Sequence, residues 1–355
     1  MSASVLQGRP LDCPADGVYP APMEILQGVA PPRFQALAAF LGDAAAEALL
    51  AEAALQGKPG LVGPSRPGAH DDMDHPLMVA SAESLRPWFA AFASRALSAA
   101  AGGAANGAGA VAGPREILAA LRPLGLRAEE DMFRTTHGVN THKGAVFTLG
   151  LLVAAAALAV ADYGDGDGDG EPGGALAETV LRLAAAMASG IVGAELAGHA
   201  RAAGCTVGTA GIGADGAGTV SAGTRLYREL GVRGVRGEAE DGYPILARRI
   251  LPPLRRSRSA PVGEREMALM DALLGSMAEL DDTCVLSRGG PEGLAIVRAG
   301  AARVLEAGAL HTDEGRAALA RLDAEFVERR LSPGGSADLL AAGIFLDAVE
   351  VALGP

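Results

Sequence analysis

Hydrophobic positions recur at spacings of three and four residues over most of the chain, which predicts α-helices. The clearest case is residues 32–55, where apolar side chains share one helix face: Phe34, Leu37, Leu41, Ala45 and Leu49. The same reasoning predicts helices at about 76–100, 114–123, 127–134, 145–161, 175–203, 264–280, 291–307, 312–330 and 336–352. No segment alternates strongly with the period of two that a half-buried strand shows. The pattern therefore predicts an all-α fold.

The segments outside this pattern suggest how the chain is organised. Residues 1–32 are rich in Pro and Gly without a period, so we expect a loose N-terminal arm there and a single helical domain over 33–355. Three tracts rich in Gly, Ala or Asp, at 99–113, 162–174 and 204–218, are typical of loop insertions. The polar motifs of the chain are expected on the turns between buried helices.

Composition and charge exclude several classes of protein. The formal net charge of −12 argues against a nucleic-acid partner or an anionic membrane surface, both of which favour a basic face. Cys13, Cys205 and Cys284 lie far apart, in neither a disulfide nor a zinc pattern. The N-terminus lacks the order of a signal peptide. The apolar run 144–161 is mostly Ala, Gly and Leu, which favours a buried core helix over a membrane span. We expect a cytoplasmic protein.

A polar stretch, THGVNTHKG at 136–144, directly precedes the apolar run. Asn140, Thr141, His142 and Lys143 offer an amide, a hydroxyl, an imidazole and an ammonium within four residues. Donors at a helix N-terminus suit an anion, because the free N–H groups and the helix dipole point the same way. Although the chain has 30 Lys and Arg residues, its only lysines are Lys143 and Lys58, each beside a glycine. A plain helix N-cap with incidental polar residues is the alternative.

Acidic residues recur on two predicted turns. Asp72 and Asp74 lie two residues apart beside a predicted helix start, and Asp282 repeats the theme later in the chain. Carboxylates in this arrangement are suitable ligands for Mg²⁺ bound to a polyphosphate. A helix cap with acidic first-turn residues is the alternative. The neighbouring His70–Asp71 pair is also typical of metal-dependent phosphohydrolases of the HD class, but the other histidines do not clearly supply the further ligands that such enzymes need.

Basic and small residues on the remaining turns are candidates for anion binding. Arg236 lies between glycines two residues before Glu238, and Arg288 precedes a glycine pair. Arginine can hold a phosphate at two points, and Glu238 has the chemistry of a base or a metal ligand. A surface charge pair on a loop is the alternative. Ser336 either belongs to a backbone cradle for an anion or caps the last helix, and capping alone would explain Asp338 in its first turn.

Five blocks in chain order resemble the triphosphoribosyl-dephospho-coenzyme A synthase family. They are KPGLV with GAHDDMD, GVNTHKG, VRGEAEDGYP, DDTCVLSRGGPEG and LSPGGSADLL, and they span residues 58–340. The chain departs from the family pattern at two positions. Val235 replaces the Ala of the usual GARGEA, and Cys284 replaces the Asn of the usual DTN, which removes the amide.

The resemblance implies a predominantly helical enzyme that uses Mg²⁺. It would convert ATP and 3′-dephospho-coenzyme A into 2′-(5″-triphosphoribosyl)-3′-dephospho-coenzyme A and adenine. The product is the prosthetic-group precursor for the acyl carrier protein of malonate decarboxylase or citrate lyase, and a separate transferase attaches it. The order GAHDDMD and the lack of a fused second enzyme favour the malonate decarboxylase branch. A homodimer is one assembly to test.

The implied chemistry assigns hypothetical roles to these residues. The transition state resembles an oxocarbenium ion, so the reaction needs a base for the attacking hydroxyl, a donor for adenine and cations for the triphosphate. Glu238 is the proposed base, with His142 an alternative acid or base. The proposed Mg²⁺ ligands are Asp72, Asp74 and Asp282. The proposed substrate and phosphate contacts are Lys58, His70, Asn140, Thr141, Lys143, Arg236, Arg288 and Ser336.

Two other functions remain open on the sequence alone. A helical metal-dependent phosphohydrolase would release phosphate from nucleotides rather than adenine. A non-catalytic carrier would bind dephospho-coenzyme A and deliver coenzyme A derivatives to an acyl carrier protein without turnover.

Overall fold

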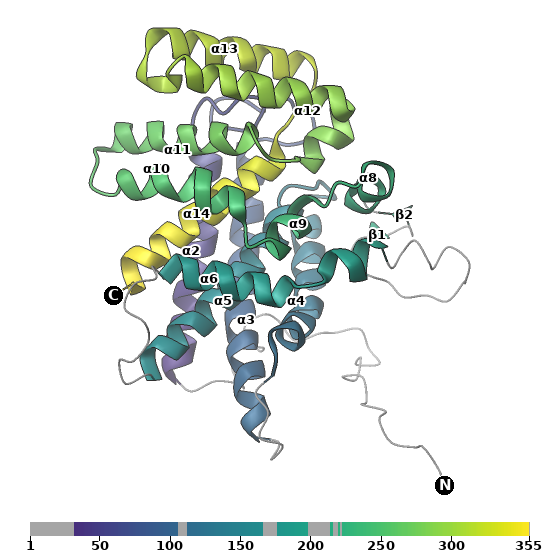
Figure 1. The fold of residues 1–355 in the computed structure, drawn as a ribbon, viewed down its shortest axis with the longest axis vertical. Helices are drawn as coiled ribbons and strands as arrows, with labels where there is room; N and C mark the ends of the chain where they lie inside the picture. The colour runs from purple at the N-terminus through teal and green to yellow at the C-terminus, as the bar shows by residue number, and fades with distance from the viewer. Residues whose placement is uncertain are drawn as a thin grey trace.

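The computed structural model describes residues 32–105, 112–165, 176–197, 214–215, 219–220 and 222–354, and Figure 1 shows an assembly of packed helices. The α-helices are α2 (Pro32–Ala54), α3 (His75–Ala105), α4 (Pro114–Thr135), α5 (Lys143–Asp165), α6 (Leu176–Ala188), α8 (Ala222–Leu230), α9 (Gly234–Glu240), α10 (Leu251–Arg256), α11 (Val262–Met277), α12 (Thr283–Glu306), α13 (Asp313–Glu328) and α14 (Gly334–Leu353). Shorter elements are the π-helices η1 (Val192–Ala197) and η3 (Leu246–Ile250), the 3₁₀ helix η4 (Ala309–His311), and the antiparallel strands β1 (Ala214–Asp215) and β2 (Thr219–Val220). The all-α prediction is confirmed.

Helix α5 occupies the centre of the core. Its Ala-, Leu- and Val-rich sequence packs against α2, α3, α4, α6 and α14. Side chains from Leu151 to Ala157 are buried on every face of the helix, which explains why this segment shows no amphipathic stripe. Small alanines let the neighbouring helices approach closely. The polar start of α5 at Lys143 is consequently held in a fixed place by the packing of the rest of the helix.

The boundaries of α4 differ from the prediction. The two helices expected at 114–123 and 127–134 form one helix that continues through Pro123. The proline removes one backbone hydrogen bond at a cost of about 3 kcal/mol. The helix buries an apolar stripe on both sides of it, made of Ile117, Leu121, Leu124, Ala128 and Met132. Because each large buried side chain contributes about 1.5–3 kcal/mol, the packing outweighs the lost bond.

Helix α12 begins at Thr283, eight residues before the predicted start. Asp282 caps it, and its side chain accepts hydrogen bonds from the N–H groups of Cys284 and Val285. Gly290, with φ of 61°, interrupts the helical geometry, so two helical segments meet at a kink. The glycine pair that suggested a loop is therefore the site of this kink.

Short helices in 222–256 were not predicted. Helices α8, α9 and α10 and the π-helix η3 are all there. None exceeds nine residues, which is too short for a clear hydrophobic period. The VRGEA motif was expected on a glycine-flanked loop, and this was wrong, because it forms α9. The helix predicted over 175–203 ends at Ala188, where Ser189 and Gly190 turn the chain before η1.

The predicted insertions are partly helical. Helix α3 extends to Ala105 and α5 to Asp165, so the first parts of two glycine-rich tracts continue the preceding helices. Most of the rest of the three tracts lies outside the described residues. The same is true of the N-terminal arm, except for Pro32, which begins α2.

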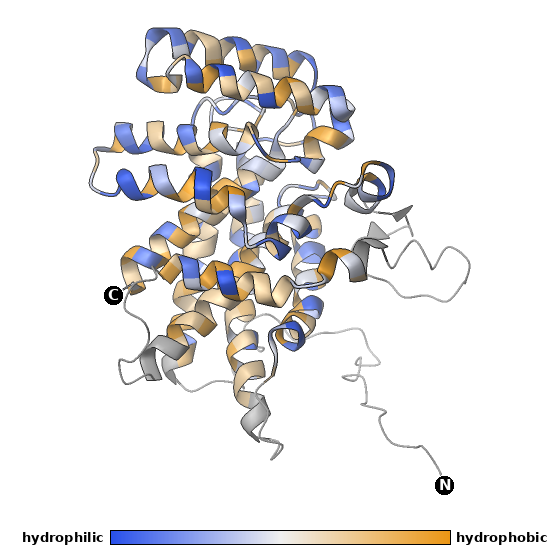
Figure 2. Cartoon of the chain, viewed as in Figure 1, coloured by the Kyte–Doolittle hydropathy of each residue, from blue (hydrophilic) through white to orange (hydrophobic). Residues whose placement is uncertain are grey.

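Within the described residues, three helical segments are long and apolar enough, by length and composition, to cross a membrane: Phe34–Ala54, Lys143–Ala161 and Leu176–Ala194. The sequence had singled out only the second. In the second, 72% of the apolar window is buried inside the protein, as predicted for a core helix. Figure 2 shows α3 and α5 apolar over most of their length, whereas α13 carries hydrophilic positions along its outer edge.

Candidate active site

A cavity of about 650 Å³ collects the sequence motifs. Segments from α4, α5, α9, α12 and α14 line it, together with the loop between α2 and α3. The predicted site residues that line it are Lys58, His70, Asp72, Asn140, Thr141, His142, Lys143, Arg236, Glu238, Asp282 and Arg288. The two that do not are Asp74 and Ser336. The predicted residues that line the cavity are thus up to 230 positions apart in the sequence, from Lys58 to Arg288.

Three helix N-termini open on this cavity. Helices α5, α12 and α14 begin at Lys143, Thr283 and Gly334, and all three of these residues line the space. The first N–H groups of a helix have no partner within it, and the helix dipole places partial positive charge there. Three such ends favour a polyanion in the cavity, although the whole chain is acidic.

The turn before α5 is shaped by local hydrogen bonds. Thr136 donates to the carbonyls of Met132 and Val139 at 2.8 and 2.6 Å, which closes the end of α4. Gly138 has φ of 90°, a conformation that glycine adopts without strain. The Asn140 amide oxygen accepts from the N–H of Lys143 at 3.3 Å and so caps α5. The helix cap given as the alternative is therefore present, and Asn140 and Lys143 also line the cavity.

His142 presents one ring nitrogen without a partner. Its Nδ1 lies 2.8 Å from the Ser81 hydroxyl, which also contacts the Thr141 hydroxyl at 2.7 Å. Its Nε2 is buried and has no hydrogen-bond partner in the described protein. Burial, followed by the nearby charge of Lys58, lowers the pKa of His142 to about 3. The imidazole is therefore neutral near pH 7 and suited to hydrogen bonding rather than to taking up a proton.

Both lysines are held by carboxylates. The Lys58 ammonium donates at 2.6 Å to the backbone carbonyl and to the carboxylate of Glu52, and both side chains are almost fully buried. The Lys143 ammonium lies 3.3 Å from the Glu129 carboxylate, in a more open position. Each lysine still lines the cavity. Their charges are therefore partly neutralised at the cavity wall.

The loop that carries Lys58 and His70 is anchored to α13. The buried Asp323 accepts from the N–H of Gly60 at 3.0 Å and forms an ion pair with Arg66. These contacts fix a segment that has few regular backbone hydrogen bonds of its own. They add to the hydrogen bonds that join Lys58 to Glu52 and His70 to Ser332.

His70 lies in a network with two other motifs. Its Nε2 is 2.7 Å from the Ser332 hydroxyl, and Arg288 donates to its Nδ1 at 3.1 Å. Burial lowers the pKa of His70, and Arg288 adds to this shift, while Asp72 opposes it. The network places the Arg288 guanidinium at the cavity wall, where it can bind a phosphate oxygen.

Asp282 and Ser336 connect α12 with α14. One carboxylate oxygen of Asp282 accepts from the N–H groups of Cys284 and Val285, and the other accepts from the N–H and hydroxyl of Ser336. Burial nevertheless raises the pKa of Asp282. Gly335 lies close beside it, and a Cβ there would make a tight contact of 3.1 Å with the carboxylate. Both residues thus join the two helix starts, and Ser336 points into this junction.

The predicted magnesium ligands are not gathered into one site. Asp72 is half exposed beside His70, whereas Asp74 caps α3 by accepting from the N–H of Leu77 at 3.0 Å. Asp282 is occupied by four donors. No group of three or more His, Cys, Asp or Glu side chains in the described part of the chain is arranged to hold a metal ion. The described residues therefore do not form a metal centre made by protein side chains alone, such as that of an HD-class phosphohydrolase.

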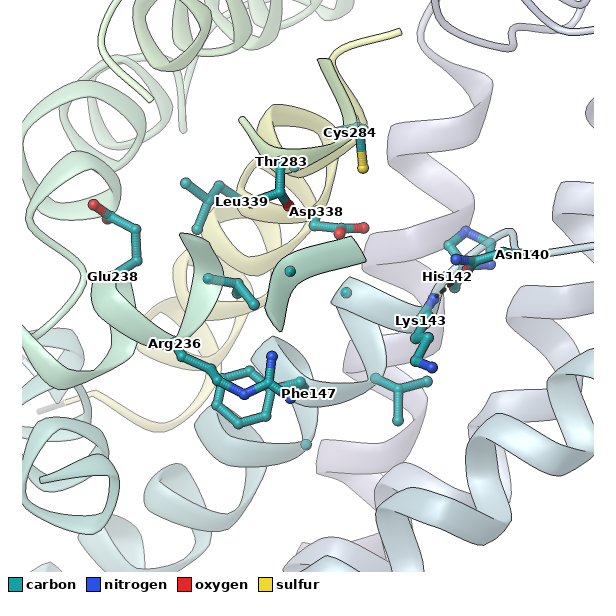
Figure 3. Close-up of a pocket in the computed structure, with 18 of the residues that line it drawn as sticks. Asn140, His142, Lys143, Phe147, Arg236, Glu238, Thr283, Cys284, Asp338 and Leu339 are labelled. Carbon is teal, nitrogen blue, oxygen red and sulfur yellow. Dashed lines mark hydrogen bonds between the residues drawn. The ribbon is translucent and has the colours of Figure 1, made fainter. Parts of the chain in front are cut away.

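Arg236 and Glu238 come from α9, on the opposite side of the view in Figure 3 from Asn140, His142 and Lys143. The Arg236 guanidinium stacks 5.6 Å from the centre of the Phe147 ring. Glu238 accepts from the N–H of Ile245 at 3.3 Å, and burial raises its pKa. Arg233 is the surface residue of this motif, paired with Asp241. A surface charge pair thus occurs at Arg233. Arg236 and Glu238 line the cavity, and in Figure 3 the Glu238 carboxylate points away from Asp338 and His142.

The comparisons with known proteins agree with this geometry. The sequence profile of the ATP:dephospho-CoA triphosphoribosyl transferase family (CitG) matches residues 38–354, which includes every residue of the cavity. The chain belongs to this family.

Curated relatives of this transferase carry a matching name. A probable 2-(5″-triphosphoribosyl)-3′-dephosphocoenzyme-A synthase of Pseudomonas syringae pv. tomato is 40% identical over 91% of this chain and 96% of its own length. Proteins of the same name from Stutzerimonas stutzeri and Azotobacter vinelandii are 41% and 40% identical, over 86% and 90% of this chain and 90% and 94% of their own lengths. No solved structure matches the chain.

Sequence reasoning about the transferase missed two cavity residues of interest. Asp338 was attributed to helix capping, but its carboxyl group caps nothing and faces the cavity. Gly144 makes room for it, since a Cβ at that position would lie 2.1 Å from a carboxyl oxygen of Asp338. Glu52 was also missed, because a single Glu in an amphipathic helix gives no sign that it pairs with a distant lysine.

Replacing Asp74 by alanine tests its placement outside the site. We expect a loss of about 0.5–2 kcal/mol in the free energy of unfolding, because the N-cap of α3 is removed. Urea unfolding measures this loss. Adenine release and its dependence on Mg²⁺ concentration are expected to stay at the unmodified level, since Asp74 does not line the cavity. If the alanine variant needed a higher Mg²⁺ concentration for its half-maximal rate, Asp74 would be a metal ligand after all.

Proposed function

We propose that the transferase joins the triphosphoribosyl group of ATP to the ribose 2′-hydroxyl of 3′-dephospho-coenzyme A and releases adenine. The observation that supports this most strongly is the meeting of five motif blocks at one cavity walled by three helix N-termini. Both substrates are polyanions, so a cavity of this electrostatic character suits them. The family membership supplies the reaction class.

The cations and helix ends are proposed to hold the triphosphate. Lys143, Arg236 and Arg288 line the cavity from three different elements, and Lys58 lies beside Glu52 at its wall. The triphosphate stays attached to the sugar in this reaction, so these contacts act by positioning the sugar carbon that is attacked. His70, Asn140 and Thr141 would add hydrogen bonds to the substrates, and Ser336 would act through Asp282.

Glu238 is the proposed base. The substrate 2′-oxygen forms a bond to C1′ of the ATP ribose as the bond from C1′ to adenine breaks, and the hydroxyl proton passes to a Glu238 oxygen. A carboxyl group with a raised pKa is a stronger base than an ordinary one, and burial supplies that shift here. His142, whose pKa is about 3, is proposed to bind a substrate oxygen or nitrogen through Nε2.

Mg²⁺ is proposed to arrive with ATP. Because the described carboxylates do not form a metal site, the triphosphate oxygens and water would be its main ligands, as is usual for Mg²⁺ on nucleotides. Asp72 is the one predicted ligand that is both cavity-lining and open to solvent. No step of the proposed reaction depends on it.

The biological setting proposed from the GAHDDMD order is malonate decarboxylase rather than citrate lyase. A separate transferase would attach the product to the acyl carrier protein of that enzyme. We propose a cytoplasmic location and, as the assembly to test by size-exclusion chromatography with light scattering, a homodimer.

Incubation of purified protein with ATP, dephospho-coenzyme A and Mg²⁺, followed by mass spectrometry, tests the reaction. We expect free adenine in equal amounts with a coenzyme A adduct that carries a triphosphoribosyl group. Formation of ADP or phosphate without adenine would instead indicate a phosphohydrolase. Bound dephospho-coenzyme A without turnover would indicate a carrier. A second experiment distinguishes the two settings. The product is supplied, with the matching transferase, to the acyl carrier protein of malonate decarboxylase and to that of citrate lyase, and attachment to each carrier protein is compared.

A further inference from the structure

The proposed reaction leaves one chemical task without a residue, and the inference below rests on that reaction. Adenine departs with the electron pair of its bond to C1′, so it needs a proton from an acid as it leaves. Glu238 takes up a proton and cannot supply one in the same step. His142 is neutral and holds no proton that it can readily give up. The donor must come from another group at the cavity.

The carboxyl groups of the cavity differ in their partners. Seven line it. Asp72 is half exposed to water, and five others have a donor or a cation beside them: Glu52 with Lys58, Glu129 with Lys143, Glu238 with the N–H of Ile245, Asp281 with Arg298, and Asp282 with four donors. Such partners stabilise the ionised form. Asp338 has no hydrogen bond or ion pair with any described residue, so no described neighbour stabilises its ionised form.

The surroundings of Asp338 reinforce this difference. Burial raises its pKa well above the ordinary value, and the negative charges of Asp282 and Glu52 raise it further. It follows the first turn of α14, beyond most of the influence of that helix dipole. Gly144 at the start of α5 leaves space for its carboxyl group. In Figure 3 it lies between Glu238 on one side and Asn140 and His142 on the other.

We infer that Asp338 is the catalytic acid that protonates adenine as it leaves. The carboxyl proton of Asp338 passes to a ring nitrogen of adenine while the hydroxyl proton of dephospho-coenzyme A passes to Glu238. Each transfer is one proton, so the site ends with Glu238 protonated and Asp338 ionised. Exchange with water restores both groups. The two carboxyl groups then act as they do in inverting glycosidases, one as base and the other as acid.

An analogue with a different leaving group tests this role directly. In the test compound, 4-nitrophenolate replaces adenine at C1′ of the ribose 5′-triphosphate, and it leaves as a stable anion without protonation. We expect Asp338→Asn to lower kcat with ATP by about 10²-fold, the lower end of the effect of a general acid. With the 4-nitrophenyl compound, the same variant is expected to stay within a few-fold of the unmodified enzyme. Release of 4-nitrophenolate is followed by its absorbance.

Matched variants separate the acid from other roles. Glu238→Gln is expected to slow both compounds, because its base is needed whichever group leaves. Asp313→Asn changes a fully exposed carboxylate on α13 and serves as the control for the substitution itself. Far-ultraviolet circular dichroism and urea unfolding confirm that Asp338→Asn is folded.

Two results would overturn the inference. Equal slowing of both compounds by Asp338→Asn would show that its role is not leaving-group protonation. Restoration of the ATP rate by excess Mg²⁺ would identify Asp338 as a metal ligand instead. Failure of the proposed function is distinguishable from either, because the unmodified enzyme would then release no adenine from ATP.

Discussion

Replacing Glu238 with glutamine is expected to lower kcat for adenine release by about 10²–10⁴-fold, the range typical of a lost general base. Glutamine keeps the size of the side chain and can still accept from the N–H of Ile245, so α9 and its turn should keep their structure. It cannot take up the hydroxyl proton. The rate is measured by separating adenine chromatographically under saturating ATP and dephospho-coenzyme A.

The pH profile gives a second measurement on the same residue. A base works when it is ionised, so kcat/KM is expected to rise with pH through the pKa of Glu238. Burial raises that pKa, which places the midpoint above the value for an exposed glutamate. In Glu238→Gln this acidic limb is expected to disappear. A limb that persists unchanged in the variant would assign the titration to another group.

Glu240→Gln is the control for this experiment. Glu240 lies on the same helix and accepts from the N–H of Gly190 at 2.6 Å, a bond that a glutamine oxygen can replace. It does not line the cavity. An equal loss of activity in both variants would indicate that α9 had moved, and would remove the case for Glu238 as base.

Replacing Lys58 with methionine is expected to cost about 3–5 kcal/mol in the free energy of unfolding. The Lys58 and Glu52 side chains are 1% and 4% exposed, so loss of the ammonium leaves a buried carboxylate without its cation. Lys143→Met is the matched comparison, because it removes the only other lysine. That pair with Glu129 is 20% and 12% exposed, and we expect a smaller loss. Urea unfolding followed by circular dichroism measures both.

A double variant separates stability from catalysis. Removing both charges with Glu52→Leu and Lys58→Met is expected to restore most of the lost stability, since a buried ion pair can often be replaced by apolar groups. If Lys58 binds phosphate, the stable double variant will still have a raised KM for ATP. A double variant that is stable and has an unchanged KM would limit Lys58 to a structural role. A single variant as stable as the unmodified chain would contradict the buried pair itself.

The sequence predicted the long helices well, because each carries a hydrophobic period or a continuous apolar run. It predicted α5 and α14 within a few residues of their observed limits. It was less informative between 222 and 256, because the short helices there are stabilised by packing and show no clear hydrophobic period of their own. The break expected at Pro123 was wrong for the same reason, since burial on both sides of the proline holds α4 together.

The chemistry of the site was only partly readable from the chain. Lys143, Arg236 and Glu238 stand out by residue type and flanking glycines, and all three line the cavity. Asp338 could not be distinguished from a helix cap, because its lack of partners depends on residues from α2, α5 and α12. Asp282 looked like a ligand, and only the folded arrangement reveals that its oxygens join two helix starts.

The placement of the glycine-rich tracts bears on how such a chain can change during evolution. Helices α3 and α5 begin at the cavity and run for 31 and 23 residues, about 46 and 34 Å, before the tracts that follow them. Relatives can therefore gain or lose residues after Ala105 or Asp165 with little selective consequence for catalysis. The segment after η1 differs, because Ala194 lines the cavity only three residues before η1 ends. Length variation there is expected to be under tighter selection.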